Sequence, residues 1–123
     1  MVAARDAAGL HTTNQAWNMV EGVLHAFRRR LTVDQALRFS DCLPPVVRAL
    51  FVENWHPQAI PEPFGTREEI LDEVRSVRHE HNFSPSNSVE AVAEALRACT
   101  DIDLLERVLS TLPIAARDFW TVP

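Results

Sequence analysis

Carboxylate and imidazole side chains recur at helical spacing in two parts of the chain. Glu21 and His25 stand four residues apart, as do Glu90 and Glu94, so each pair would lie on one face of a helix. If two such helices packed together, these ligands could converge on a metal ion. Di-metal sites in helical bundles use a Glu-x-x-His spacing, however, which Glu21 and His25 do not have. We therefore keep the Glu21, His25 and Glu90 region as an alternative small-ligand or metal site.

Arginine provides a second group of candidates. Arg28, Arg29 and Arg30 follow one another at the end of a predicted helix, where cations suit the negative end of the helix dipole. Adjacent arginines could instead bind an anion or a phosphate group. We prefer the helix-end interpretation and keep the anion site as its alternative.

Two further arginines, Arg48 and Arg117, each follow a Leu-Pro pair at the same distance. Each could donate to backbone carbonyls that the preceding helix leaves open at its end. Each could instead pair with Glu21 or Glu90, or face a ligand. These alternatives stay open at this point.

The sequence has no glycine-rich phosphate loop, nucleophile elbow or zinc-binding motif. The repeated ionisable residues are Glu, Asp and Arg, which helix ends and ion pairs explain. We therefore assign no catalytic, cofactor-binding or metal residue, expect no cofactor, and expect a non-enzymatic protein.

The elements that must position these residues come from an internal repeat. Residues 20–51 and 89–120 align without a gap at an offset of 69, and ten of the 32 aligned positions are identical. Chance alone would give about two identities at ordinary residue usage. Such self-similarity predicts two related structural units.

Helix boundaries recur within both copies. Apolar spacing predicts a first helix over 16–31, and Thr32 with Gln35 forms a capping box for the next one. The predicted core stripe consists of Trp17, Val20, Leu24, Phe27 and Leu31 in the first helix, Val33, Ala36 and Leu43 in the second, and Ile102, Leu105, Leu109 and Leu112 in the second copy. In the second copy the residue aligned with Thr32 is Asp101, another strong N-cap. Because proline disfavours helix in the residue before it, each Leu-Pro pair predicts a corner with a buried leucine. Third helices are expected at about 45–54 and 113–120.

Between the copies, residues 55–65 contain three prolines and predict a loop. Thr66 and Glu69 form a capping box for an extra helix that runs to about residue 81. After a second loop, Ser86 or Asn87 is expected to cap the next helix. A small-residue stripe that includes Gly22 predicts close contact between the two first helices, or between a first helix and its own third helix.

Composition limits the function classes. The 123 residues carry a net charge of −5 and no lysine, which argues against nucleic acid as the main partner. No apolar run is long enough to span a membrane, and the N-terminal sequence lacks a signal-peptide pattern. We expect a cytoplasmic protein in which Cys42 and Cys99 are buried free thiols.

Several motifs resemble one bacterial family, catalogued as domain of unknown function 2267. They are Val23-Leu24-His25-Ala26-x-Arg28-x-Arg30-Leu31, Leu43-Pro44 with Arg48, Trp55-x-Pro57, Arg67-Glu68-Glu69-Ile70, and Leu112-Pro113 with Arg117 and Trp120. The resemblance spans about 16–120 and implies a small all-helical bacterial cytoplasmic protein with stress-response neighbours. It implies no activity and no catalytic residue. One departure is Asn54, where the family tends to glycine.

Together these observations predict a single all-α domain over 1–123, with about seven helices. Two related three-helix repeats, at about 16–55 and 86–120, are joined by a linker and an extra helix within 56–85. The expected function is a non-enzymatic protein-interaction or regulatory module. Its partner would be an unidentified protein, bound in a groove between the copies, or a second copy in a homodimer.

Overall fold

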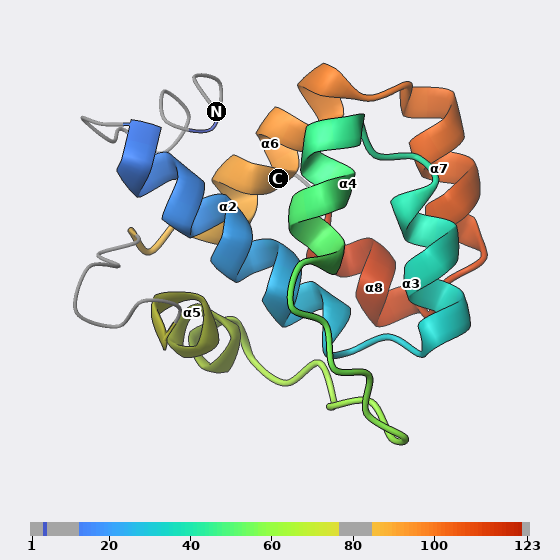
Figure 1. Cartoon of the computed structure of the whole chain (residues 1–123), viewed down its shortest axis with the longest axis horizontal. Coiled ribbons are helices and arrows are strands. Elements are labelled where there is room, and N and C mark those ends of the chain that lie inside the picture. Colours follow the sequence, from blue (N-terminus) through green and yellow to red (C-terminus); the bar gives the residue numbers. More distant parts are fainter. Residues whose placement is uncertain (1–3, 5–12, 77–84, 122–123) are drawn as a thin grey trace.

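The computed structural model describes residues 4, 13–76 and 85–121 (Figure 1). This part of the chain contains seven α-helices and no strand, so the all-α fold class is confirmed. The helices are α2 (Thr13–Arg28), α3 (Val33–Ser40), α4 (Pro45–Val52), α5 (Arg67–Ser76), α6 (Ser88–Cys99), α7 (Ile102–Ser110) and α8 (Ile114–Phe119). None of these helices is long and apolar enough to cross a membrane.

Helix α2 is the centre of the arrangement. It contacts α4, α5 and α6, while α3 packs against α7 and α7 against α8 (Figure 1). Its buried stripe includes Val20, Leu24 and Phe27, as the apolar spacing predicts. Trp17, which the same spacing places in the core, is 38% exposed, so that prediction is wrong.

The predicted caps of the second helices are confirmed. Thr32 and Gln35 form a reciprocal capping box at the start of α3. Asp101 accepts hydrogen bonds from the backbone N–H groups of Asp103 and Leu104 at the start of α7. Each cap satisfies backbone donors that have no partner within the helix.

The two Leu-Pro corners are also confirmed. Leu43 and Leu112 are buried, and Pro44 and Pro113 occupy the N-cap positions of α4 and α8. The first residues of the second helices are the exception, because Val33 and Ile102 are exposed rather than part of the core. Each lies in the first helical turn, and the inward face of its helix is occupied by Ala36 or Leu105 instead.

One cluster of buried side chains includes residues from both copies. Phe27 of α2 lies at the centre of its aromatic part, with ring centroids 4.8 Å from Phe39 and 5.0 Å from Trp120. Phe39 and Trp120 stack nearly parallel at 5.6 Å. Since Phe39 belongs to the first copy and Trp120 to the second, a shared core holds the two together.

The helix starts of the two copies are in register along the chain. Helices α3 and α7 begin at Val33 and Ile102, and α4 and α8 begin at Pro45 and Ile114, at the offset of 69 that relates the sequences. That the two units superpose in space about an approximate twofold axis stays a prediction.

The extra helix, α5, explains the small residue in α2. A Cβ atom at Gly22 would lie 2.6 Å from the carbonyl oxygen of Val74 in α5. Gly22 therefore permits close approach of α5, and the expectation that it faces α6 or α4 is wrong. The end of the predicted extra helix, beyond residue 76, lies outside the described residues.

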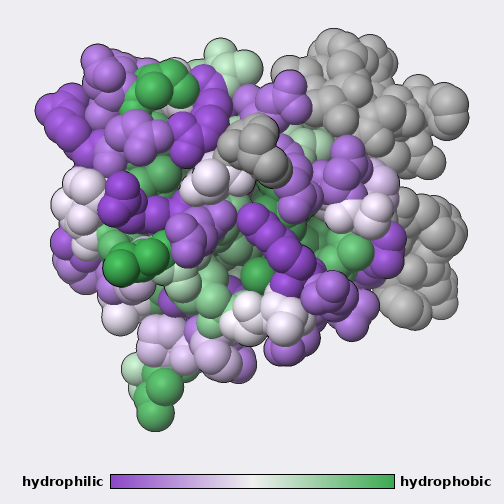
Figure 2. Space-filling view, turned by 180° about the vertical axis from the view of Figure 1, so that it is seen from behind, coloured by the Kyte–Doolittle hydropathy of each residue, from purple (hydrophilic) through white to green (hydrophobic). Residues whose placement is uncertain are grey.

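The loop between α4 and α5 projects from the helical body (Figure 1). Ile60 in this loop is 82% exposed. The face of the molecule in Figure 2 mixes polar and apolar areas, with apolar side chains at its lower edge. Asn54 in this loop has a φ of 50°. Asparagine tolerates this left-handed conformation better than most residues, which accounts for Asn54 at a position that suits glycine.

Candidate functional site

The structure does not assemble the candidate metal site. His25 uses its Nε2 atom to bind the carbonyl oxygen of Leu50 in α4, at 2.9 Å. Glu90 faces Arg67 of α5, with 3.7 Å between Arg67 Nε and the carboxylate. Across the described residues, no three His, Cys, Asp or Glu side chains lie close enough to hold a metal ion. As a metal site, the Glu21, His25 and Glu90 alternative therefore has no geometric support within the described residues.

His25 serves instead as a buried hydrogen-bond donor between two helices. Because a carbonyl oxygen can only accept, the neutral ring must carry its proton on Nε2. Burial lowers the pKa of His25 below 6.5, and the nearby charges of Arg28 and Arg29 lower it further against the hydrogen bond to Leu50. The ring is therefore neutral at neutral pH.

Arg28 binds backbone carbonyls at the C-terminal end of α4. Its Nη1 atom donates to the carbonyl oxygens of Phe51 and Glu53, both at 2.8 Å, and its guanidinium lies 5.9 Å from the centre of the Trp55 ring. The residue is only 7% exposed. Burial lowers the pKa of Arg28 to about 10, which still leaves it charged at neutral pH.

Arg30 joins α2 to α5. Its two terminal nitrogens form a bidentate pair with the Glu73 carboxylate at 2.8 and 2.9 Å, and Nη1 also donates to the Ala26 carbonyl. Arg29 reaches the same carboxylate at 3.2 Å. The Glu73 carboxylate thus forms ion pairs with two arginines at once.

The arginine run has more tertiary contacts than the helix-end interpretation anticipates. Arg28 and Arg30 are buried and bind partners that lie more than 20 residues away in the chain. Most of those partners are backbone carbonyls, and because every residue has one, the sequence does not show which carbonyl is the acceptor. Glu73 is the one partner whose residue type suggests an ion pair, and nothing in its spacing indicates that it contacts the arginines at the end of α2.

The two repeated arginines of the third helices have different roles. Arg48 donates from Nε to the carbonyl of Ser40 at 3.0 Å and from Nη2 to that of Leu43 at 3.1 Å. It therefore binds the open carbonyls at the end of α3, which was one of its predicted alternatives. Arg117 is exposed, and no side-chain hydrogen bond of this kind occurs at its corner within the described chain.

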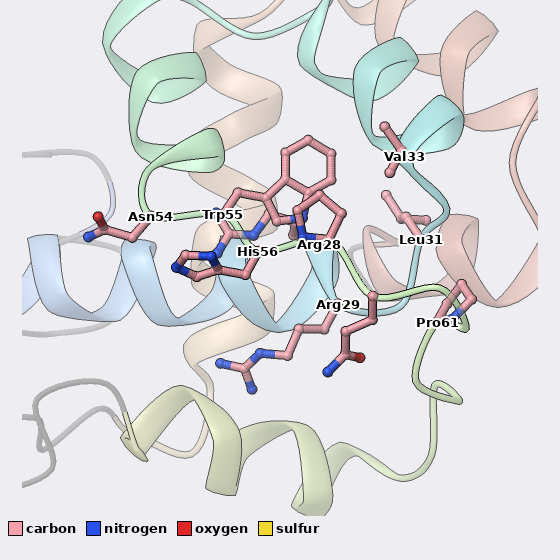
Figure 3. Close-up of a pocket in the computed structure, with 10 residues that line it drawn as sticks. Arg28, Arg29, Leu31, Val33, Asn54, Trp55, His56 and Pro61 are labelled. Carbon is pink, nitrogen blue, oxygen red and sulfur yellow. The ribbon is translucent and has the colours of Figure 1, made fainter.

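A mixed pocket lies between the end of α2 and the loop after α4. It has a volume of about 220 Å³, and Figure 3 shows Arg28 beside Trp55, with Leu31 and Val33 to one side of them. Its walls also include polar and proline residues of the loop, namely Asn54, His56, Pro57, Gln58 and Pro61. We call it the Trp55 pocket.

A second, mainly apolar groove of about 200 Å³ lies between α2, α4 and α6, and we call it the interhelical groove. Its lining is formed by Ala4, Val20, Leu24, Pro44, Val47, Val92, Ala95, Leu96 and Cys99. The groove thus lies between helices of the two copies. Ala4, from the start of the chain, forms part of this lining and is 2% exposed.

The cysteines differ in exposure, contrary to the prediction that both are buried. Cys42 is buried, and burial raises the pKa of its thiol to about 11. Cys99 is exposed at the edge of the interhelical groove, because it is the last residue of α6. Both thiols are free.

Fold and geometry together define a small all-α protein in which a central helix is fixed by buried His and Arg side chains bound to backbone carbonyls of its neighbours. Over residues 1–119 the chain matches the family described as Uncharacterized conserved protein (DUF2267), and it belongs to that family. No curated protein matches the chain. The family assignment made from the Leu-Pro corners and the Trp55-x-Pro57 motif is therefore confirmed.

Proposed function

We propose that this protein is a non-enzymatic interaction module that binds an apolar helical segment of a partner protein in the interhelical groove. The observation that carries the proposal is an open apolar groove lined by side chains of α2, α4 and α6, against which the buried Ala4 packs. A small aliphatic side chain is thus already packed against the walls of the groove.

The lining of the groove favours a helix as the occupant. Val20 and Leu24 stand four apart on α2, and Val92 and Leu96 stand four apart on α6, so both walls present rows at helical spacing. An amphipathic helix can lay small or branched aliphatic side chains between such rows, and burial of their apolar surface drives the association.

Ala4 also suggests how such binding would be regulated. We infer that a partner helix displaces the chain's own Ala4 from this lining, so that Ala4 acts as a competitor. A competitor attached to the same chain acts at an effective concentration in the millimolar range. A cytoplasmic regulatory partner, in line with the stress-response neighbours implied by the family resemblance, suits a site controlled in this way.

The buried side chains that could take part in catalysis are already bound to other parts of the protein, which supports a non-enzymatic role. His25, Arg28 and Arg30 are each engaged by carbonyl or carboxylate oxygens that hold α2 against α4 and α5. For His25 and Arg30, these hydrogen bonds explain the burial without a substrate.

The exposed thiol of Cys99 allows a direct binding test. The full chain is labelled there with an environment-sensitive fluorophore, since Cys99 is exposed whereas Cys42 is buried. It is then titrated with a synthetic peptide of residues 1–12. We expect saturable binding, and we expect Ala4→Asp to tighten it about tenfold because the internal competitor is weakened.

A matched control carries the label on α7 instead, as Ser110→Cys in a Cys99→Ser background, where the peptide should cause no change. Equal affinity for the wild type and Ala4→Asp, or no saturable signal at Cys99, would refute the proposal. If Ala4 of one copy instead packed into the groove of a second copy, the protein would form a concentration-dependent dimer. That result would refute competition within one chain.

A further inference from the structure

We propose that the Trp55 pocket binds a small organic anion, in which one carboxylate or phosphate group is attached to a flat apolar body. This site is separate from the interhelical groove, and the two share no lining residue. The inference is therefore independent of the proposed function.

The first element of the site is the incomplete bonding of Arg28. Both of its hydrogen bonds are donated by Nη1, and its buried Nε atom has no partner in the described part of the chain. Arg28 forms no ion pair there with a carboxylate. A buried guanidinium that is only partly satisfied is an unusual cost, which an anion in the adjoining pocket would reduce.

The second element is Arg29. It shares the carboxylate of Glu73 with Arg30, which binds that group through two nitrogens at 2.8 and 2.9 Å. Two guanidinium groups therefore face one carboxylate, and the charge of Arg29 is only partly compensated. Its side chain is 39% exposed, so a ligand can reach it.

The third element is the charge of the lining. No acidic residue is among the ten that line the pocket, although the whole chain carries a net charge of −5. Asn54, His56 and Gln58 add further hydrogen-bond donors beside the arginines. The pocket is thus a local region that favours a negative ligand on an otherwise acidic protein.

The apolar half of the pocket sets the shape of the ligand. The Trp55 ring, Leu31, Val33 and Pro61 supply apolar surface next to the arginines (Figure 3). At about 220 Å³ the pocket is smaller than the usual range for drug-sized ligands. A bare inorganic ion would leave the apolar wall unused, whereas a ring bearing one anionic group contacts both halves.

The electrostatics of Arg28 agree with this assignment. Burial and the neighbouring Arg29 lower its pKa to about 10, while Glu21 and Glu53 act in the opposite direction. The two carboxylates therefore do not cancel the cost of the buried charge. An anion bound beside Arg28 would raise this pKa again.

The test uses NMR of the full chain with three probes: phenyl phosphate, benzoate and inorganic phosphate, at constant ionic strength. We expect the first two to shift the Trp55 indole N–H and the backbone amides of residues 54–58 in a saturable way. The stronger of the two identifies phosphate or carboxylate as the preferred group. Inorganic phosphate should bind at least about tenfold more weakly, because it lacks the apolar contact.

Variants separate a specific site from general attraction to cations. Arg29→Gln should weaken binding about tenfold by removing a charge-assisted hydrogen bond, whereas exposed Arg117→Gln should leave it unchanged. Arg29 is chosen because loss of buried Arg28 could unfold the end of α4. Absence of saturable shifts with both aromatic probes would overturn the proposal, as would equal binding by Arg29→Gln or no preference over inorganic phosphate.

Discussion

At the scale of single residues, buried and exposed basic side chains bind the backbone at helix ends. His25, Arg28 and Arg48 all donate to backbone carbonyls near the end of a neighbouring helix. The types of these residues were visible in the sequence, and so was the chance that Arg48 binds carbonyls. The acceptors of His25 and Arg28 could not be predicted, because every residue carries the same carbonyl and only the packing of α2 on α4 selects one.

His25 makes stability depend on pH. Since burial lowers its folded-state pKa below 6.5, the unfolded chain binds the proton more readily than the folded one. This contribution to stability is present above pH 6.5 and is lost as pH falls from there toward the lower folded pKa. Urea unfolding at a series of pH values from neutral to mildly acidic should show a steeper loss for the wild type than for His25→Gln, which cannot titrate.

The exposed His56 lies in the loop after α4, and His56→Gln provides the matched control for the effect of a His-to-Gln substitution itself. An NMR titration of the His25 ring gives a second reading that does not require the variant to fold. A ring that titrates above pH 6.5, or equal slopes for wild type and His25→Gln, would contradict the assignment.

At the scale of elements, the sequence predicted where helices begin better than it predicted which helices contact one another. Thr32 and Asp101 begin α3 and α7 as expected, because capping depends on residues within one turn. The contact partner of Gly22 was predicted wrongly, because it depends on how α5 docks on α2. Helix α5 has no counterpart in the first copy, so the repeat held no information about its position.

The two proline corners provide a matched pair of substitutions. Both side chains are exposed, but Arg48 binds the carbonyls of Ser40 and Leu43 at the end of α3, whereas Arg117 forms no such side-chain hydrogen bond within the described residues. Arg48→Ala should therefore lower the free energy of unfolding by about 1–2 kcal/mol. Arg117→Ala should change it by less than about 0.5 kcal/mol. Both values come from denaturant titration of the full chain, and equal losses would show that the corners are energetically equivalent.

At the scale of the whole molecule, the two copies share a core in which Phe27, Phe39 and Trp120 meet. The all-α class followed from the repeat and its caps. The Trp55 pocket and the interhelical groove could not be located from the sequence, since each combines side chains from segments far apart in the chain. A groove between the copies was expected in general terms, but its walls and Ala4 within it were not.

The most direct test of the central claim is a cross-linking measurement between Ala4 and Cys99, which both line the interhelical groove. The Ala4→Cys chain is treated with a short bis-maleimide, and the linked sites are identified by mass spectrometry. We predict a rapid link between positions 4 and 99 of one chain, suppressed by an excess of the peptide of residues 1–12. Ser110→Cys in place of Ala4→Cys should link to Cys99 much more slowly. Absence of the link between positions 4 and 99, or its formation only between two chains, would contradict the account.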